Sequence, residues 1–155
     1  MNLLVTGGGG FIGSHVLEHV IRQPEVARVV NLDCLTYAGR LENVATAAIS
    51  PKYHFERVDL RDQAAVVRVV RDLAITHVIH LAAESHVDRS IAAPADFIHT
   101  NIVGTFHLLE ACRIHWGSSE FQVSGSKLGP RFVHVSTDEV FGSLGATGRF
   151  TEATP

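Results

Sequence analysis

The feature that most constrains the fold of this chain is a glycine-rich turn that directly follows a short apolar segment. The segment Asn2–Thr6 is typical of a buried strand, and Gly7-Gly8-Gly9-Gly10-Phe11-Ile12-Gly13 comes immediately after it. Apolar residues then recur at helical spacing over Ser14–Arg22. Glycine at Gly7, Gly10 and Gly13 permits a tight turn, close approach to a pyrophosphate, and close packing of helix on strand. This order predicts a dinucleotide-binding unit with the phosphates at the helix N-terminus.

Short apolar segments alternate with helical patterns along the rest of the chain. Strands that are apolar on nearly every residue and separated by helices predict a parallel sheet covered on both faces. We therefore expect one α/β domain over residues 1–155 with a Rossmann-like, doubly wound parallel sheet. The polar stretch Trp116–Gly129 is interpreted as a surface insertion. Further strands are expected at Arg28–Asp33, Tyr53–Val58, His77–Leu81 and Arg131–Ser136, and further helices at Leu41–Ile49, after the N-cap Asp62, and at Pro94–Ile114.

Composition excludes several classes of protein. The chain has 155 residues with a formal net charge of −3 and no run of Lys or Arg, which argues against a nucleic-acid partner. No apolar run approaches the roughly 18 residues of a membrane span, and Met1–Thr6 lacks the basic start of a secretory signal. Cys34 and Cys112 are interpreted as reduced thiols of a cytoplasmic protein. His15 and His19 share a helix without an acidic partner, so no metal site is expected.

Two aspartates follow expected strands. Asp33 ends the second strand about 20 residues after Gly13. A carboxylate there accepts hydrogen bonds from both ribose hydroxyls and repels a 2′-phosphate, which favours NAD over NADP. Asp59 ends the third strand beside the expected adenine pocket. The alternative for Asp33 is a role in capping a helix or a turn, and the alternative for Asp59 is turn capping.

Small side chains follow the fourth strand in Leu81-Ala82-Ala83. Small residues at the carboxyl end of a strand allow a cofactor to approach closely. Packing between a helix and the sheet is the alternative explanation for Ala82 and Ala83.

Paired acids follow the fifth strand in Ser136-Thr137-Asp138-Glu139. Ligands of an open parallel sheet bind beyond the carboxyl ends of its strands. Two adjacent carboxylates at that place are unfavourable unless they are solvated or used in chemistry. The alternatives are therefore an acid–base pair and an inert, exposed pair.

The glycine spacing resembles that of the extended short-chain dehydrogenase/reductase family. Further segments narrow the resemblance to nucleotide-sugar 4,6-dehydratases, those that act on dTDP-glucose above all, and it covers almost the whole chain apart from 116–129. These segments are Leu32-Asp33-Cys34-Leu35-Thr36-Tyr37-Ala38-Gly39, His80-Leu81-Ala82-Ala83-Glu84-Ser85-His86-Val87-Asp88-Arg89-Ser90, Thr100-Asn101-Ile102-Val103-Gly104-Thr105 and Ser136-Thr137-Asp138-Glu139-Val140-Phe141-Gly142.

The resemblance implies NAD as the cofactor and assigns its contacts. Phe11 and Ile12 are expected along the pyrophosphate, and the adenosine ribose is expected to contact Asp33, Leu35 and Thr36. Asp59 and Leu60 are expected beside the adenine. The nicotinamide half is expected to contact Leu81, Ala82, Ala83, Ser85 and Thr100, and Ser85 also faces the sugar nucleotide.

The resemblance also implies a reaction in which a nucleotide-activated glucose loses water to give a 4-keto-6-deoxy sugar. Glu139 is the expected base at C5, Asp138 the expected acid at the departing C6 hydroxyl, and Thr137 the expected hydrogen-bond partner of the C4 oxygen. Asp138 must then be protonated at working pH while Glu139 stays ionised.

The chain departs from this family in one chemically important motif. The superfamily uses Tyr-x-x-x-Lys at C4, but Tyr37 and Tyr53 are followed four residues later by Leu41 and Arg57. We therefore expect the sheet to be truncated after about five strands, the substrate domain to be absent, and this chain alone to bind NAD weakly or not at all and to be inactive.

Smaller departures are peripheral to that chemistry: Phe141 replaces a tyrosine and Arg40 an asparagine. The resemblance implies a homodimer for the full-length parent through the helix Pro94–Ile114, an arrangement not expected of this chain alone.

Two alternative functions remain. A UDP-sugar epimerase or decarboxylase of the same superfamily would share the fold and cofactor but generally lacks the pair Asp138-Glu139. A non-catalytic nucleotide-binding fragment is favoured by the absent Tyr-x-x-x-Lys.

Overall fold

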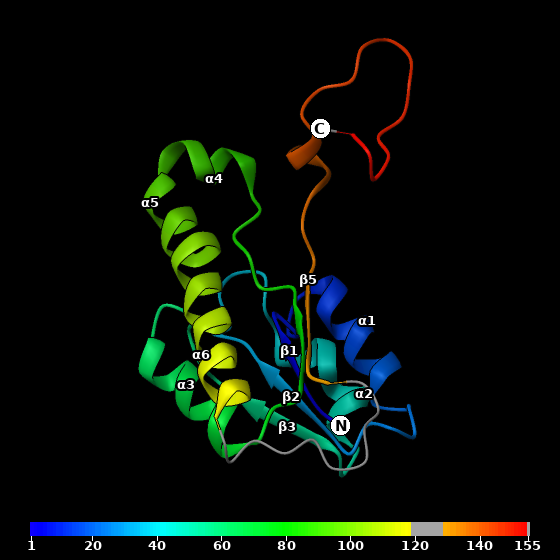
Figure 1. Ribbon diagram of the computed structural model, residues 1–155, viewed down its shortest axis with the longest axis vertical. Helices are drawn as coiled ribbons and strands as arrows, with labels where there is room; N and C mark the ends of the chain where they lie inside the picture. Colours follow the sequence, from blue (N-terminus) through cyan, green and yellow to red (C-terminus); the bar gives the residue numbers. More distant parts are fainter. Residues whose placement is uncertain (119–128, 155) are drawn as a thin grey trace.

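The sheet of this protein is parallel throughout. The computed structural model describes residues 1–118 and 129–154. Within them the strand order is β3-β2-β1-β4-β5, each strand parallel to its neighbours (Figure 1), which confirms the doubly wound α/β prediction. The strands are β1 (Asn2–Thr6), β2 (Arg28–Leu32), β3 (Tyr53–Glu56), β4 (His77–His80) and β5 (Arg131–His134).

Helices cover the sheet in two layers. One layer contains α1 and α2 and the other contains α3 and α6 (Figure 1). The helical segments are α1 (Phe11–Val20), η1 (Leu41–Val44), α2 (Ala45–Ala48), α3 (Gln63–Asp72), α4 (Val87–Ala92), α5 (Pro94–Phe97), η2 (Ile98–Gly104), α6 (Thr105–Gly117) and η3 (Asp138–Phe141).

Alternate side chains of the central strand enter two separate cores. Leu3 and Val5 pack with Leu17 of α1, whereas Leu4 packs with Leu108 of α6. This follows from the two-residue period of a strand. Because both faces of β1 are buried, its sequence is apolar on successive residues rather than alternating, as expected for a parallel sheet.

The order of the strands determines which edge of the sheet is suited to bind a ligand. After β3 the chain passes back to β4 on the other side of β1, so the topological switch lies between β1 and β4. The glycine turn after β1 and the acids after β5 therefore lie at the same carboxyl edge of the sheet. Ligands of open parallel sheets bind at this kind of position.

The structure is helical over the expected range Pro94–Ile114, but in three consecutive segments instead of one α-helix. These segments are α5, the π-helical η2 and α6, and the preceding α4 was not predicted. The last residues of α6 correct the start of the expected insertion, because Trp116 lies in the helix and its Nε1 donates to the Ile75 carbonyl at 2.8 Å. Most of that insertion, residues 119–128, lies outside the described residues.

In the part of the chain that the structure describes, no helix is both long and apolar enough to cross a bilayer.

Candidate active site

The glycine turn is packed directly against the end of β4. Gly7 has φ +73°, and a Cβ there would lie 2.8 Å from the Cα of Ala82. A Cβ on Gly13 would collide with the Gly7 carbonyl. The Gly7 N–H donates to Leu32 at 2.9 Å, and the Gly10 N–H donates to Gly7 at 3.2 Å. Gly7 and Gly13 are therefore required by the close packing of the turn against β4 and on itself.

The start of α1 presents groups suited to an anion. Gly10 is the N-cap, and the N–H groups of the first turn have no acceptor within the helix. Phe11 and Ile12 leave 79% and 61% of their surfaces exposed at this turn. The residues therefore fit a pyrophosphate at the helix N-terminus, where the partial positive charge of the helix favours it.

Asp33 holds the β2 loop and the glycine turn together. It is buried at 8% exposure, and its Oδ2 accepts from the Gly9 N–H at 2.8 Å. Its Oδ1 accepts from the Leu35 N–H at 2.8 Å, and Leu35 has φ +57°. A carboxylate has about four acceptor positions, so positions remain for ribose hydroxyls. Leu35 and Thr36 follow Asp33 in the loop after β2, and their predicted contacts with the ribose stay predictions.

Asp59 is already bound by an arginine. The Arg61 guanidinium contacts Asp59 at 2.6 Å and holds the pKa of that carboxyl below its usual range. The Leu60 side chain is buried in the core and its carbonyl oxygen is contacted by His107 Nδ1 at 2.9 Å. The predicted contacts of Asp59 and Leu60 with adenine stay predictions. Burial, together with the charges of Asp59 and Asp33, raises the pKa of the nearby Cys34 thiol.

A buried polar network joins the ends of β1 and β4. The Thr6 Oγ1 accepts from the N–H groups of Leu81 at 3.3 Å and Ala82 at 3.2 Å. With its lone pairs engaged, it donates its proton to His80 Nδ1 at 2.6 Å. The neutral ring then carries its proton on Nε2 and donates to Thr105 Oγ1 at 2.8 Å. The network fixes the backbone of the expected nicotinamide residues.

His80 is held neutral by its surroundings. Burial, and secondly the neighbouring His134, lowers its pKa to about 4. The rings of His80 and His134 lie with their centroids 5.0 Å apart. Since charging His80 would bring a proton into the core, the neutral form is the one that supports the network.

The loop after β4 is fixed to η2 by an amide. Asn101 Oδ1 accepts from the Glu84 N–H at 2.8 Å, and Asn101 Nδ2 donates to the Glu84 carbonyl at 2.8 Å. Ala83 and Ser85, on either side of Glu84, are exposed, and the neighbouring Thr100 is half-buried in η2. Their predicted contacts with cofactor and sugar stay predictions.

The acids after β5 are close together and open to solvent. Thr137 caps η3 by accepting from the Glu139 N–H at 3.3 Å, and its hydroxyl donates to Asp138 at 3.3 Å. All three residues are exposed. Figure 1 shows the chain continuing past the end of β5 and away from the sheet before it reaches η3. The acid–base assignment stays a prediction.

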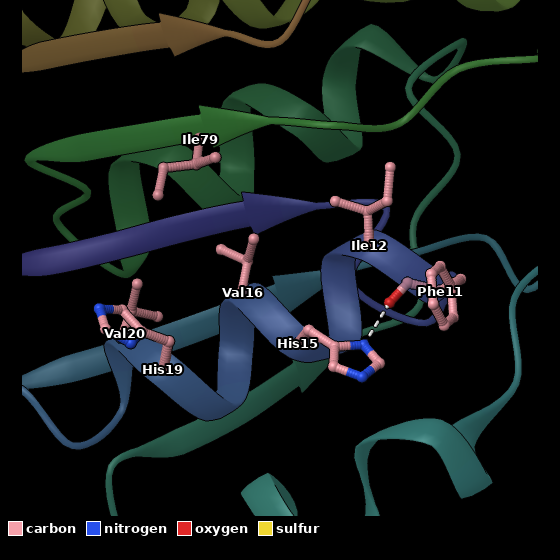
Figure 2. A pocket seen from close by; sticks show the side chains of 7 residues that line it. All are labelled: Phe11, Ile12, His15, Val16, His19, Val20 and Ile79. Atoms are coloured by element: carbon pink, nitrogen blue, oxygen red, sulfur yellow. Dashed lines mark hydrogen bonds between the residues drawn. The ribbon is translucent and has the colours of Figure 1, made fainter.

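An apolar cavity of about 590 Å³ lies along α1. Figure 2 shows Val16 and Ile12 of α1 facing Ile79 of β4, while His15 turns back to the Phe11 carbonyl, which it contacts through Nδ1 at 2.8 Å. The cavity contains Phe11 and Ile12 of the predicted site but neither Asp33 nor the acids after β5. Among the described residues, no group of three or more potential metal ligands converges.

Sequence reasoning did not single out Thr6, His80, Asn101 or Thr105. The signal for two of them was a polar residue that follows the apolar middle of a strand and ends it, Thr6 in β1 and His80 in β4. A buried polar side chain at such a position needs a partner, so the pair could have been inferred. The roles of Asn101 and Thr105 depend on tertiary contacts alone.

The fold and this edge together define a Rossmann-like domain of the extended short-chain dehydrogenase/reductase class. The chain belongs to the GDP-mannose 4,6 dehydratase family, whose model matches residues 4–155. A dTDP-glucose 4,6-dehydratase of Neisseria meningitidis serogroup B is 53% identical over 154 residues, which is 99% of this chain and 42% of that protein.

Solved structures agree with this assignment. DesIV, a dTDP-glucose 4,6-dehydratase from Streptomyces venezuelae with NAD and TYD bound, is 41% identical with a TM-score of 0.83, over 100% of this chain and 45% of that one. A UDP-glucose 4-epimerase from Thermotoga maritima with UDP-glucose is 31% identical with a TM-score of 0.74, over 95% and 41%. The chain thus spans less than half the length of these relatives.

Proposed function

We propose that this chain is the NAD-binding half of an enzyme that dehydrates a nucleotide-activated glucose, dTDP-glucose in the first place, to the 4-keto-6-deoxy sugar. The observation that carries the proposal is the pair Asp138-Glu139 at the same sheet edge as the glycine turn. Relatives at about half identity are dTDP-glucose 4,6-dehydratases, and one solved relative holds NAD.

The residues present fit the dinucleotide. The glycine turn and the start of α1 hold the pyrophosphate, Asp33 with Leu35 and Thr36 holds the adenosine ribose, and Asp59 lies near the adenine. The segment Leu81–Ser85 flanks the nicotinamide; Thr6 holds its backbone at Leu81 and Ala82, and Asn101 holds it at Glu84. Bound NAD supplies a hydride acceptor at the start of the reaction and a hydride donor at its end.

The chain's own acids carry out the elimination in this proposal. Glu139 removes the C5 proton, which a ketone at C4 makes labile. Asp138 donates a proton to the departing C6 hydroxyl, and water leaves. Thr137 and Ser85 position the sugar by hydrogen bonds, Thr137 at the C4 oxygen. The two acids thus have opposite protonation states at the start.

A chimera tests the proposal. Residues 1–155 replace the matching part of the Neisseria meningitidis enzyme, which supplies the other half. We expect the chimera to convert dTDP-glucose to its 4-keto-6-deoxy product. Asp138→Asn and Glu139→Gln are each expected to lower kcat about 100-fold or more, whereas Glu152→Gln, an exposed acid further along the chain, should leave it unchanged.

The test has two adverse outcomes. A folded, NAD-bound chimera without turnover contradicts the dehydratase proposal. Full activity of the Asp138→Asn and Glu139→Gln variants contradicts the acid–base assignment and favours an epimerase-like site. The 155-residue chain alone should bind NAD weakly or not at all and give no product.

A UDP-sugar epimerase is the second candidate, favoured by the 31% identical structure that contains UDP-glucose. The adjacent acids argue for dehydration instead.

Cys34 and Cys112 are both free thiols, which supports a cytoplasmic location for the proposed enzyme.

A further inference from the structure

Two loops on opposite sides of β1 meet through their side chains. The β2 loop carries Tyr37 and the β4 loop carries Glu84, and the Tyr37 hydroxyl donates to Glu84 Oε2 at 3.3 Å. The guanidinium carbon of Arg89, in α4, lies 4.1 Å from the centroid of the Tyr37 ring. We name Tyr37, Glu84 and Arg89 the clasp.

The clasp spans the end of the central strand. In the sheet, β2 and β4 are the two neighbours of β1. The loops that follow β2 and β4 can touch each other only by passing over the carboxyl end of β1. The glycine turn lies at that end. Any ligand that runs along this edge from Asp33 to the segment Leu81–Ser85 must therefore lie beneath the clasp or open it.

Both sides of the clasp are anchored at their bases. On the β2 side, the Arg40 N–H donates to Gly9 at 3.0 Å and Asn43 Nδ2 donates to Gly9 at 2.8 Å, which ties the loop to the glycine turn. On the β4 side, the two hydrogen bonds of Asn101 hold the backbone of Glu84. With rigid bases, the tips are the parts of the two loops free to separate.

The contacts at the tips reinforce one another. A cation over the face of a phenol ring draws electron density toward itself. This polarises the O–H bond and strengthens the hydrogen bond that Tyr37 donates to the Glu84 carboxylate. Tyr37 leaves 48% of its surface exposed, so the clasp is accessible and can open without disturbing the core.

We propose that Tyr37, Glu84 and Arg89 are cofactor-positioning residues that close over a bound dinucleotide and retain it. This inference rests on the proposed NAD site and names residues that act on the cofactor through the two loops. Because the clasp holds the two loops in the closed arrangement before the dinucleotide binds, its loss makes binding bear the cost of ordering them. Each contact is weak, so the loss of either is expected to weaken dinucleotide binding about threefold, and loss of the whole clasp about tenfold.

The experiment is calorimetric titration with NAD of the chimera described above, in which residues 1–155 replace the matching part of the Neisseria meningitidis enzyme, after its bound NAD has been removed. Tyr37→Phe keeps the ring over which Arg89 lies and should raise Kd about threefold. Tyr37→Leu removes both contacts and should raise Kd about tenfold. Arg89→Gln should fall between them. Arg113→Gln, which removes an exposed arginine of α6 paired with Glu110, is the matched control and should leave Kd unchanged.

A double-variant cycle separates positioning from general loop damage. Tyr37→Leu with Arg89→Gln should bind no more weakly than Tyr37→Leu alone, because the arginine acts through the ring. Unfolding in urea is followed for each variant, and the unfolding free energies should match that of the unsubstituted chimera. Tyr37→Phe and Arg89→Gln keep the test decisive if Tyr37→Leu is poorly folded.

The outcomes are distinguishable. Measurable NAD binding with equal Kd in all variants overturns the clasp and leaves the proposed function intact. Strictly additive effects of Tyr37→Leu and Arg89→Gln also overturn it. Absence of NAD binding by the folded, unsubstituted chimera, at millimolar NAD, overturns the cofactor site and the clasp with it.

Discussion

At the scale of single residues, two backbone positions show how little room the glycine turn leaves. Gly7 combines a left-handed φ with contact to the Ala82 backbone, whereas a Cβ on Gly10 would meet the Gly7 carbonyl at 3.4 Å, an ordinary contact. The sequence alone does not distinguish Gly7 from Gly10, but only Gly7 lacks room for a side chain.

We predict that Gly7→Ala lowers the free energy of unfolding by about 2 kcal/mol or more, from the left-handed backbone and the contact with Ala82. Gly10→Ala, the matched control, should cost less than about 1 kcal/mol. Chemical denaturation measures both. Equal losses for the two variants would show that the close approach of the turn to β4 is not what requires glycine.

The buried His80 predicts a pH dependence. Its pKa of about 4 lies below that of an unfolded histidine, so the unfolded state binds more protons between these values. Stability is therefore complete above about pH 6.5 and falls as pH drops toward 4, by about 3 kcal/mol from this residue. Burial lowers the pKa of His77 and His115 as well, which adds to the same trend.

The measurement is urea unfolding at several pH values between 7 and 4. His80→Asn keeps an acceptor for Thr6 but cannot titrate, so its stability should fall less steeply with acid. His19→Gln on the exposed face of α1 is the matched control and should follow the unsubstituted chain. A His80→Asn profile parallel to that chain would contradict the assignment.

At the scale of elements, patterns that are local in sequence were predicted well. The strand Asn2–Thr6 has its predicted bounds, and the helix after Asp62 has its predicted cap, with the Ala65 N–H donating to Asp62 Oδ1 at 3.0 Å. Both depend on apolar periodicity and capping chemistry, which a sequence displays directly.

Elements that depend on tertiary contacts were not predicted. Nothing local indicates the π-helical η2. There Asn101 reaches back to Glu84, and a Cβ on Gly104 would lie 2.9 Å from the Leu60 Cβ, so the segment is shaped by neighbours far away in sequence. In the candidate site, the glycine turn, Asp33 and the acids after β5 were named from motifs. The His80 network and the clasp follow from strand order and loop packing.

The cap of α3 gives a prediction at this scale. Asp62→Ala leaves an N–H of the first turn without its acceptor and should lower the free energy of unfolding by about 1 kcal/mol. Asp72→Ala removes an acid of the same type at the other end of α3, where the helix dipole does not favour it, and should not destabilise the fold. Thermal denaturation of both variants checks this, and a larger loss for Asp72→Ala would refute the capping argument.

At the scale of the whole molecule, a row of apolar side chains remains exposed outside the sheet. On η2 and α6 these are Ile98, Ile102, Phe106 and Leu109, from 46% to 60% exposed. Their spacing places them along one side of the helix. An exposed apolar stripe of this kind is typical of a surface that another subunit covers, which supports a homodimer for the proposed full-length enzyme.

The dimer is predicted to depend on this stripe. In the chimera with the Neisseria meningitidis enzyme, Phe106→Glu places a charge at the centre of the stripe, where burial without a partner is costly. Sedimentation velocity should show a monomer for Phe106→Glu. Ile49→Glu, at a position 85% exposed after α2, should leave the dimer intact. A charge is tolerated at a position that stays in contact with solvent, so only the variant at the interface should dissociate the dimer. Dissociation by Ile49→Glu but not by Phe106→Glu would place the interface on the opposite layer of helices.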